Sequence, residues 1–307
     1  MQKILDTIKL DFDDVLIVPQ RSTLTSRSEI NLERTFKFLH SPREWTGVPI
    51  LCANMSFCSI EMAKQLAEFK MIACLHKYHS IEQLSDYFQQ YPNNINYTFV
   101  SIGYKKSDLN HLLQLKEKLV SQPNICIDVP NGHMDAFVKY CAKVREHFPE
   151  SIILAGNVTN TSSTQELLIY GGVDIAKVGI GGGSACTTRF LTGCGVPQLS
   201  CVLDNAYVSH GLQNGSKKLG LICSDGGHKT VGDVCKALCA GSDFVMLGGY
   251  FAGSEPCDGE WEFGGDYSKV FGTEETSKGR FTYYGMSTHH SQDIFEDGKK
   301  KIGRAHV

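Results

Sequence analysis

The sequence lacks several features that would assign it to other classes of protein. It has no apolar run long enough to cross a membrane as a helix. Its opening residues, MQKILDTIKLDF, carry acidic groups too early and an apolar run too short for a secretory signal peptide. A formal net charge of −3 over 307 residues gives no general attraction to nucleic acid or to an anionic membrane. We therefore expect a cytoplasmic protein that binds neither nucleic acid nor membrane and holds any phosphate by local contacts.

Paired metal or disulfide motifs are also missing. The 12 cysteines are scattered through the chain, with no CxxC pair and no Cys/His spacing typical of zinc. We expect most of them to be reduced packing residues. No GxGxxG motif opens the first predicted helix, so the sequence gives no sign of a Rossmann dinucleotide site.

From residue 48 onward the sequence repeats one unit, an apolar strand-like run followed by an amphipathic helix. The period is roughly 25 residues, as in βα units. Two of the helices open with Ser and a Glu two residues later, a typical start signal. The apolar runs, eight in all, cover residues 48–55, 71–77, 98–104, 125–132, 151–158, 173–181, 221–227 and 244–250.

Eight continuous apolar strands with helices between them predict a (β/α)8 TIM barrel, an α/β fold, more than an open doubly wound sheet. Polar residues and glycine pairs cluster where the predicted strands end, which is the active face of such a barrel. We expect one domain over residues 1–307, with an N-terminal arm over 1–47 and an atypical tail over 289–307. That tail is short, charged and without an apolar stripe, so the last barrel helix is expected to be missing or degenerate.

The residues 179–189, GIGGGSACTTR, form the most distinctive stretch of the chain. Glycine weakens regular structure and lets backbone amides approach a bound group closely. Cys186 stands there beside two threonines and Arg189, which would suit a nucleophile. A lone cysteine in a turn is more often inert packing, but the surrounding glycines, Ser184 and Arg189 favour a reactive site.

Three glycine loops are expected to meet at the active face: 181–184, 225–227 and 248–249. Barrel enzymes commonly hold phosphate between the loops after the last two strands, through backbone amides. A phosphorylated small molecule is therefore expected as ligand. Asp225 could hold ribose hydroxyls or could instead cap a helix, and the pattern alone does not decide between the two roles.

Taken together, the motifs of the chain closely resemble those of GMP reductase, and more distantly those of IMP dehydrogenase. The resemblance runs from about residue 10 to about residue 288. It is carried in order by FDDVLIVPQRSTLTSRSEI, GVPILCANM, HKYHS, IDVPNG, AGNV, KVGIGGGSACTTR, GVPQLS, SDGG, FVMLGG and YYGMS. The regulatory insertion usual in IMP dehydrogenases after the second βα unit is absent here, since Tyr91 leads directly to the third strand.

The resemblance implies an NADPH-dependent oxidoreductase that converts GMP to IMP and ammonia. Cys186 matches the nucleophile that forms a thioimidate with the purine, and Thr188 matches the proton relay to the leaving amine. A potassium ion is implied at the positions matching Gly181, Gly183, Cys186 and Arg189. A homotetramer is implied as well.

The remaining binding roles carry over position by position from the resemblance. For NADPH the matching residues are Lys77, Asp128, Val129, Pro130, Ile180 and Gly181, with Ser26 and Arg27 reaching in from a neighbouring subunit. For GMP or IMP they are Ser184, Asp225, Gly226, Gly227, Gly248, Gly249, Tyr284, Gly285 and Met286.

The chain also departs from the family pattern. His289 occupies the position of a glutamate that acts with the threonine, and Gly182 replaces a proline in the cysteine loop. Two hypotheses follow. The chain is a working reductase with His289 in the catalytic set, or it is a nucleotide-binding paralogue or shortened isoform with little activity that oligomerises with related subunits.

Overall fold

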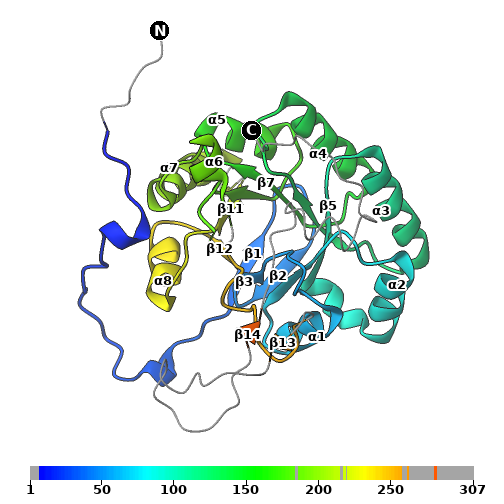
Figure 1. The fold of residues 1–307 in the computed structure, drawn as a ribbon, viewed down its shortest axis with the longest axis horizontal. Coiled ribbons are helices and arrows are strands. Elements are labelled where there is room, and N and C mark those ends of the chain that lie inside the picture. The colour runs from blue at the N-terminus through cyan, green and yellow to red at the C-terminus, as the bar shows by residue number, and fades with distance from the viewer. Residues whose placement is uncertain are drawn as a thin grey trace.

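In a computed structural model of the protein, eight parallel strands close into a barrel (Figure 1). The structure describes residues 7–183, 186–214, 217–218, 220–257, 261–262 and 280–281. Each predicted apolar run overlaps one barrel strand, which confirms the (β/α)8 prediction. Around the barrel the strands follow the order β11 (Leu221–Asp225), β12 (Phe244–Leu247), β3 (Ile50–Cys52), β4 (Ile72–Leu75), β5 (Thr98–Ile102), β6 (Asn124–Asp128), β7 (Ile153–Val158) and β8 (Ile175–Val178).

Helices follow the strands and form the outer ring of the barrel. The two predicted serine start signals are confirmed, because Ser59 Oγ accepts from Met62 N and Ser80 Oγ accepts from Gln83 N. After β12 no helix occurs in residues 248–257, and the predicted loss of the last helix concerns residues beyond this described part. The helices of the ring are α1 (Ile60–Glu68), α2 (Ile81–Gln90), α3 (Lys106–Lys118), α4 (Asp135–His147), α5 (Thr161–Ile169), α7 (Gln198–Gly211) and α8 (Val231–Cys239), with a 3-10 helix η3 (Pro92–Asn96) after α2.

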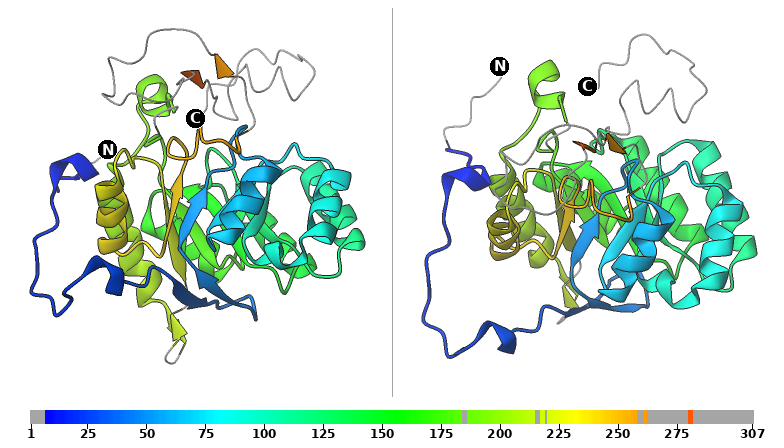
Figure 2. Two further views of the ribbon diagram at one scale, coloured as in Figure 1. Left: turned by 90° about the horizontal axis from the view of Figure 1, so that it is seen from below. Right: turned by 60° about the horizontal axis from the view of Figure 1, so that its bottom comes forward.

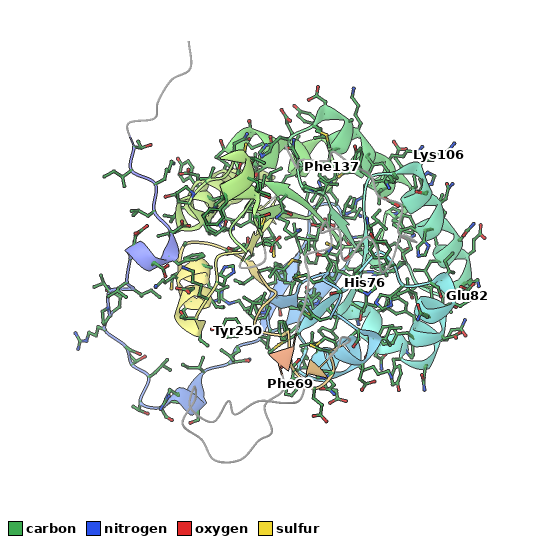
Figure 3. The ribbon with its side chains drawn as sticks, in the orientation of Figure 1. Phe69, His76, Glu82, Lys106, Phe137 and Tyr250 are labelled. Carbon is green, nitrogen blue, oxygen red and sulfur yellow. The ribbon has the colours of Figure 1, made fainter. Side chains whose placement is uncertain are left out.

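The core has two layers, one inside the barrel and one between strands and helices. Leu51, Phe99 and Leu154 belong to the inner layer, whereas Val100 packs in the outer layer with Leu112 of α3. Strands buried on both faces explain why the sequence shows continuous apolar runs and no alternation. Figure 3 shows the charged side chains of Glu82 and Lys106 at the rim of the molecule. The side chain of His76 is buried and lies inside the ring of helices.

The amino end of the barrel is closed by an antiparallel hairpin of β1 (Arg34–Lys37) and β2 (Glu44–Gly47). Trp45 is buried, and its ring lies 5.3 Å from that of Phe244 at the start of β12. Phe36 lies against the same phenylalanine, with ring centroids 4.6 Å apart. The expected arm over 1–47 thus includes a segment that completes the core. Each strand has only four residues, and the side chains of β1 are mostly exposed. The sequence of the hairpin therefore shows little periodicity.

Residues 9–13 of the N-terminal arm contact helices of the barrel, and the arm then leaves it. At η1 (Phe12–Asp14) the Phe12 ring is buried, and its carbonyl oxygen accepts a hydrogen bond from Lys236 Nζ of α8 at 2.8 Å. The following segment, which includes η2 (Arg27–Glu29), runs outside the ring of helices (Figures 1 and 2). Its apolar side chains are open to solvent, with Leu16 86% exposed.

Three further elements lie outside the barrel. One is α6 (Thr188–Thr192), a short helix that projects beyond the carboxyl ends of the strands (Figure 2). The connection from α7 to β11 contains the two-residue strands β9 (Gln213–Asn214) and β10 (Lys217–Lys218). A last pair is formed by β13 (Trp261–Glu262) and β14 (Arg280–Phe281).

Candidate active site

The glycine loops after β8 and β11 lie in backbone contact at the carboxyl end of the barrel. A β-carbon added at Gly226 would lie 2.9 Å from the backbone nitrogen of Gly183, and one added at Gly182 would lie 3.2 Å from that of Gly227. Gly226 and Gly227 have φ values of 90° and 85°, which favour glycine. The predicted meeting of these two loops is therefore confirmed, and it requires residues without side chains. The third loop, with Gly248 and Gly249, follows the neighbouring strand β12.

Cys186 lies in the first of these loops, immediately before α6. Its Sγ is 3.2 Å from the Thr188 hydroxyl, and its backbone N–H donates to the Gly183 carbonyl at 3.0 Å. The thiol is partly exposed, unlike the buried cysteines of the strands. A partly exposed sulfur beside a hydroxyl can act as a nucleophile with a proton relay at hand.

Arg189 fastens the cysteine loop to the N-terminal arm. Its Nη2 donates to the Val196 carbonyl at 2.6 Å, and its Nη1 lies 3.3 Å from Asp11 Oδ2. The arginine stem covers Gly181, where a β-carbon would come within 2.6 Å of Arg189 Cγ. The Arg189 guanidinium is thus occupied by protein acceptors. Only its backbone carbonyl, which accepts from Gly193 N–H, could approach a cation.

Below the loops, five polar side chains form one network, four from strands and one, Asn54, from the loop after β3. Lys177 Nζ on β8 is 2.6 Å from Asp128 Oδ1 on β6 and 2.8 Å from Asp225 Oδ2 on β11. Asn157 Nδ2 donates to Asp225 Oδ2 at 2.8 Å, and Asn54 Nδ2 donates to Asp128 Oδ2 at 3.0 Å. Asp225 was open to two interpretations, as a helix cap or as a ligand-binding carboxylate. Here α8 is capped by Thr230 instead, and Asp225 faces the network.

Sequence reasoning missed Lys177. A lysine inside the buried run VDIAKV was the available signal, because a buried charge requires a partner. Burial by itself lowers the pKa of this ammonium, but Asp128 and Asp225 more than offset this, and the Lys177 pKa lies well above its usual value. Burial likewise raises the pKa of Asp128, but Lys177 outweighs it and the net pKa is lowered. Both groups are therefore charged at neutral pH.

The residues expected to contact NADPH fall into two groups. Asp128 ends β6, and Val129 and Pro130 follow it at the carboxyl end of the barrel, where Ile180 and Gly181 open the cysteine loop. Lys77 is exposed after β4, with its ammonium 4.9 Å from the Tyr78 ring centre. Ser26 and Arg27 are exposed at the start of η2, and this segment of the arm lies away from the carboxyl end of the barrel (Figure 2).

The residues expected to bind GMP are brought together as far as the structure describes them. Asp225, Gly226 and Gly227 adjoin the cysteine loop, and Gly248 and Gly249 follow the neighbouring strand β12. Five further predicted site residues lie outside the described residues: Ser184, Tyr284, Gly285, Met286 and His289.

Two buried acceptors in this region lack a partner among the described residues, Asn157 Oδ1 and Gln198 Oε1. An unpaired buried acceptor is costly, so a ligand or water donor fits at each. Within the described ranges, no three His, Cys, Asp or Glu side chains gather as a metal site. The same part of the chain contains no helix with the length and apolarity needed to span a bilayer.

Known proteins are similar to this chain over most of its length. The family described as IMP dehydrogenase / GMP reductase domain matches residues 9–301. GMP reductase of Yersinia enterocolitica is 42% identical over 288 residues, covering 93% of this chain and 78% of that protein. GMP reductase 2 of Bos taurus is 45% identical over 261 residues, covering 85% and 73% respectively.

Solved structures share the architecture. Inosine 5′-monophosphate dehydrogenase from Legionella pneumophila superposes with a TM-score of 0.75 at 31% identity, covering 97% of this chain and 84% of that one. A GMP reductase from Trypanosoma brucei in complex with guanosine 5′-monophosphate gives a TM-score of 0.70 at 21% identity, covering 84% and 79%, and this second likeness concerns the fold. The sequence match across almost the whole chain places this protein in the IMP dehydrogenase / GMP reductase family.

Proposed function

We propose that the chain is a GMP reductase, an oxidoreductase that converts GMP to IMP and ammonia with NADPH. The observation that carries the proposal is the Cys186 thiol, 3.2 Å from the Thr188 hydroxyl, in a loop packed on the glycines after Asp225. The 42–45% identity to GMP reductases across most of the chain supports the same activity.

In the proposed reaction the Cys186 thiolate adds to C2 of the purine, and the bond from C2 to the exocyclic nitrogen breaks. The amine leaves as ammonia, and Thr188 passes it a proton. A thiolate suits this step because it attacks an electron-poor carbon and later leaves easily. NADPH, when bound, supplies a hydride to C2. The carbon–sulfur bond then breaks, which returns the thiolate and gives IMP.

Substrate binding is assigned to the loops after β8, β11 and β12. Backbone amides of Gly227 and Gly249 are suited to a phosphate, since close approach needs residues without side chains. The Asp225 carboxylate is suited to ribose hydroxyls because Lys177 and Asn157 both hold its Oδ2. Asn157 Oδ1 remains as a buried acceptor for a ligand donor. Tyr284, Gly285, Met286 and Ser184 stay predictions for the same substrate, as His289 does for catalysis.

The cofactor groups are assigned to the opposite part of the network. Asp128, Val129, Pro130, Lys77 and the start of the cysteine loop would hold NADPH. The cysteine loop also has the type of ligand that suits a potassium ion, because potassium prefers carbonyl oxygens such as those of the loop glycines. The ion would hold the loop in one conformation.

We further propose a homotetramer in the cytoplasm, built from one barrel domain with its arm and tail. Ser26 and Arg27 belong to the segment around η2, which lies on the outer arm and not at the carboxyl ends of the strands of its own chain (Figure 2). The exposed apolar residues of the arm, such as Leu16 and Val18, suit contact with another subunit. The arm would then bring Ser26 and Arg27 to the NADPH of a neighbour.

The activity is tested by incubating the purified chain with GMP and NADPH and separating the nucleotides by chromatography. We expect IMP to form only when both reactants are present. Tight binding of GMP by calorimetry with no IMP would favour the alternative, a nucleotide-binding paralogue without turnover.

A further inference from the structure

Lys177 is a buried charge to which the proposed reaction assigns no step. Its side chain is 2% exposed, and its neighbours along β8 are the apolar Ile175, Ala176 and Val178. A methionine of similar length would fill the same space without the cost of desolvating an ammonium. The positive charge of Lys177 is therefore explained by the two carboxylates with which it pairs.

These two carboxylates come from strands that are not adjacent. Asp128 ends β6 and Asp225 ends β11, and the barrel order places β7 and β8 between them. The ammonium bridges this gap with distances of 2.6 and 2.8 Å. Both aspartates are more open than the lysine, with side-chain exposures of 33% and 23%. The cation thus lies beneath the site, and the carboxylates lie above it toward the ligands.

We propose that Lys177 is a positioning residue that fixes the carboxylates of Asp128 and Asp225 relative to each other. The proposal rests on the proposed function, in which Asp128 serves the cofactor and Asp225 serves the ribose of the substrate. Through one shared cation, the two binding regions are held in register. Lys177 touches neither ligand, and its effect on binding is exerted through the two aspartates.

The charged and titratable groups around Lys177, Asp128 and Asp225 determine how a substitution of Lys177 would change the pKa of Asp128. On β8 the cation is Lys177 itself, and the loop after β4 contributes the exposed Lys77. The titratable groups facing the network from the other strands are Asp128 and Cys126 on β6, and Asp225 and Cys223 on β11, with His228 just beyond β11. Lys177 is the largest influence that lowers the pKa of Asp128, followed by Asn54 and Lys77. Without Lys177 this lowering is lost, so the pKa of Asp128 would be higher than in the unaltered chain.

The test measures binding of GMP and of NADP⁺ separately by calorimetry, which needs no turnover. In Lys177→Met we expect both ligands to bind at least 10-fold more weakly at pH 8. We also expect the variant to lose more NADP⁺ affinity at pH 5 than at pH 8, relative to the unaltered chain at the same pH. The reason is that Asp128 takes up a proton more readily without Lys177. Lys229→Met is the matched control, since its ammonium pairs with Asp13 at the exposed surface, and it should bind both ligands as the unaltered chain does.

A second variant covers the case in which Lys177→Met does not fold. Lys177→Met with Asp128→Asn removes one positive and one negative charge together and so keeps the charge balance of the barrel. We expect it to melt close to the unaltered chain and still to bind GMP at least 10-fold more weakly. GMP affinity within two-fold of the unaltered chain in this double variant would overturn the proposal and leave Lys177 as a charge balance only. If the unaltered chain binds no GMP, the proposed function fails instead.

Discussion

Asp11 in the N-terminal arm and Arg189 in the cysteine loop are joined across 178 positions of sequence, with Oδ2 and Nη1 3.3 Å apart. The other carboxylate oxygen of Asp11 accepts from the backbone N–H of Gln198, the first residue of α7. One side chain thus ties the arm, the cysteine loop and the start of a barrel helix together. Because the Asp11–Arg189 ion pair is partly exposed, its Coulomb attraction contributes little to stability. The hydrogen bond from Gln198 N–H at the start of α7 contributes more.

The first prediction concerns this contact. Asp11→Ala should lower the free energy of unfolding by about 1–2 kcal/mol, as losing an acceptor at a helix start does. It should also lower kcat/KM for GMP by about 10-fold, since a loosened loop misplaces the thiol. Asp13→Ala in η1, two residues further along the chain, is the control, because Asp13 and its partner Lys229 are both well exposed. Equal effects of the two substitutions would show that Asp11 does not support the loop.

The second prediction concerns Gly179, which has φ of 128°. A β-carbon there would lie 2.3 Å from the Asp225 carbonyl oxygen. Gly179→Ala must therefore move the backbone of the substrate loop, and GMP should bind at least 100-fold more weakly by calorimetry. Gly211→Ala is the control, since nothing lies within 4 Å of its added carbon and alanine favours the helix. Unchanged GMP affinity in Gly179→Ala would place the substrate elsewhere.

The third prediction concerns pH and stability. Burial lowers the pKa of His228 to about 4, and the nearby Asp225 and Asp233 only partly oppose this. Because the unfolded chain takes up this proton near pH 6.5 and the folded chain does not, stability is full above pH 6.5 and is lost toward pH 4. The loss from this group should reach about 2 kcal/mol at pH 5.

The measurement for His228 is urea unfolding at pH 7.5 and pH 5. His228→Gln should show a smaller drop between the two pH values than the unaltered chain, since glutamine does not titrate. An identical pH dependence in His228→Gln and the unaltered chain would contradict the buried neutral state of His228.

The fourth prediction concerns His289, where the resemblance implies a glutamate that acts with Thr188. A histidine is neutral or positive where the family has negative charge, and losing a positioned acid typically costs about 100- to 10,000-fold. We expect clear binding of GMP and IMP with turnover reduced on that scale. His289→Glu should restore part of the rate in a steady-state assay. Turnover of an ordinary enzyme in the unaltered chain would mean that another residue supplies the acid.

Much of the barrel was predictable because its signal is local. Runs such as 151–158 and 221–227 are apolar on both faces, and each becomes a strand buried between the barrel interior and a helix. Ser59 and Ser80 mark helix starts through bonds three residues away. The roles of Cys186 and Thr188 came from the resemblance, and their 3.2 Å separation agrees with it.

What the sequence did not reveal depends on contacts distant in the chain. The β1–β2 hairpin is stabilised by Trp45 against Phe244, about 200 positions away in the sequence. Lys177 interrupts an apolar run, and its role could not be predicted because its two partners lie on other strands. Asp11 lies in a segment without periodicity, and its acceptor role depends on the folded position of α7.

The central claim is that Cys186 performs the chemistry, and one assay tests it most directly. NADPH oxidation and ammonia release are followed together with GMP, in the unaltered chain, in Cys186→Ala and in Cys194→Ala, which removes an exposed cysteine of the neighbouring turn. We predict one ammonia for each NADPH in the unaltered chain and in Cys194→Ala. In Cys186→Ala we predict no oxidation of NADPH, with GMP affinity within a few fold. GMP-dependent oxidation of NADPH in Cys186→Ala at the rate of the unaltered chain would contradict the account.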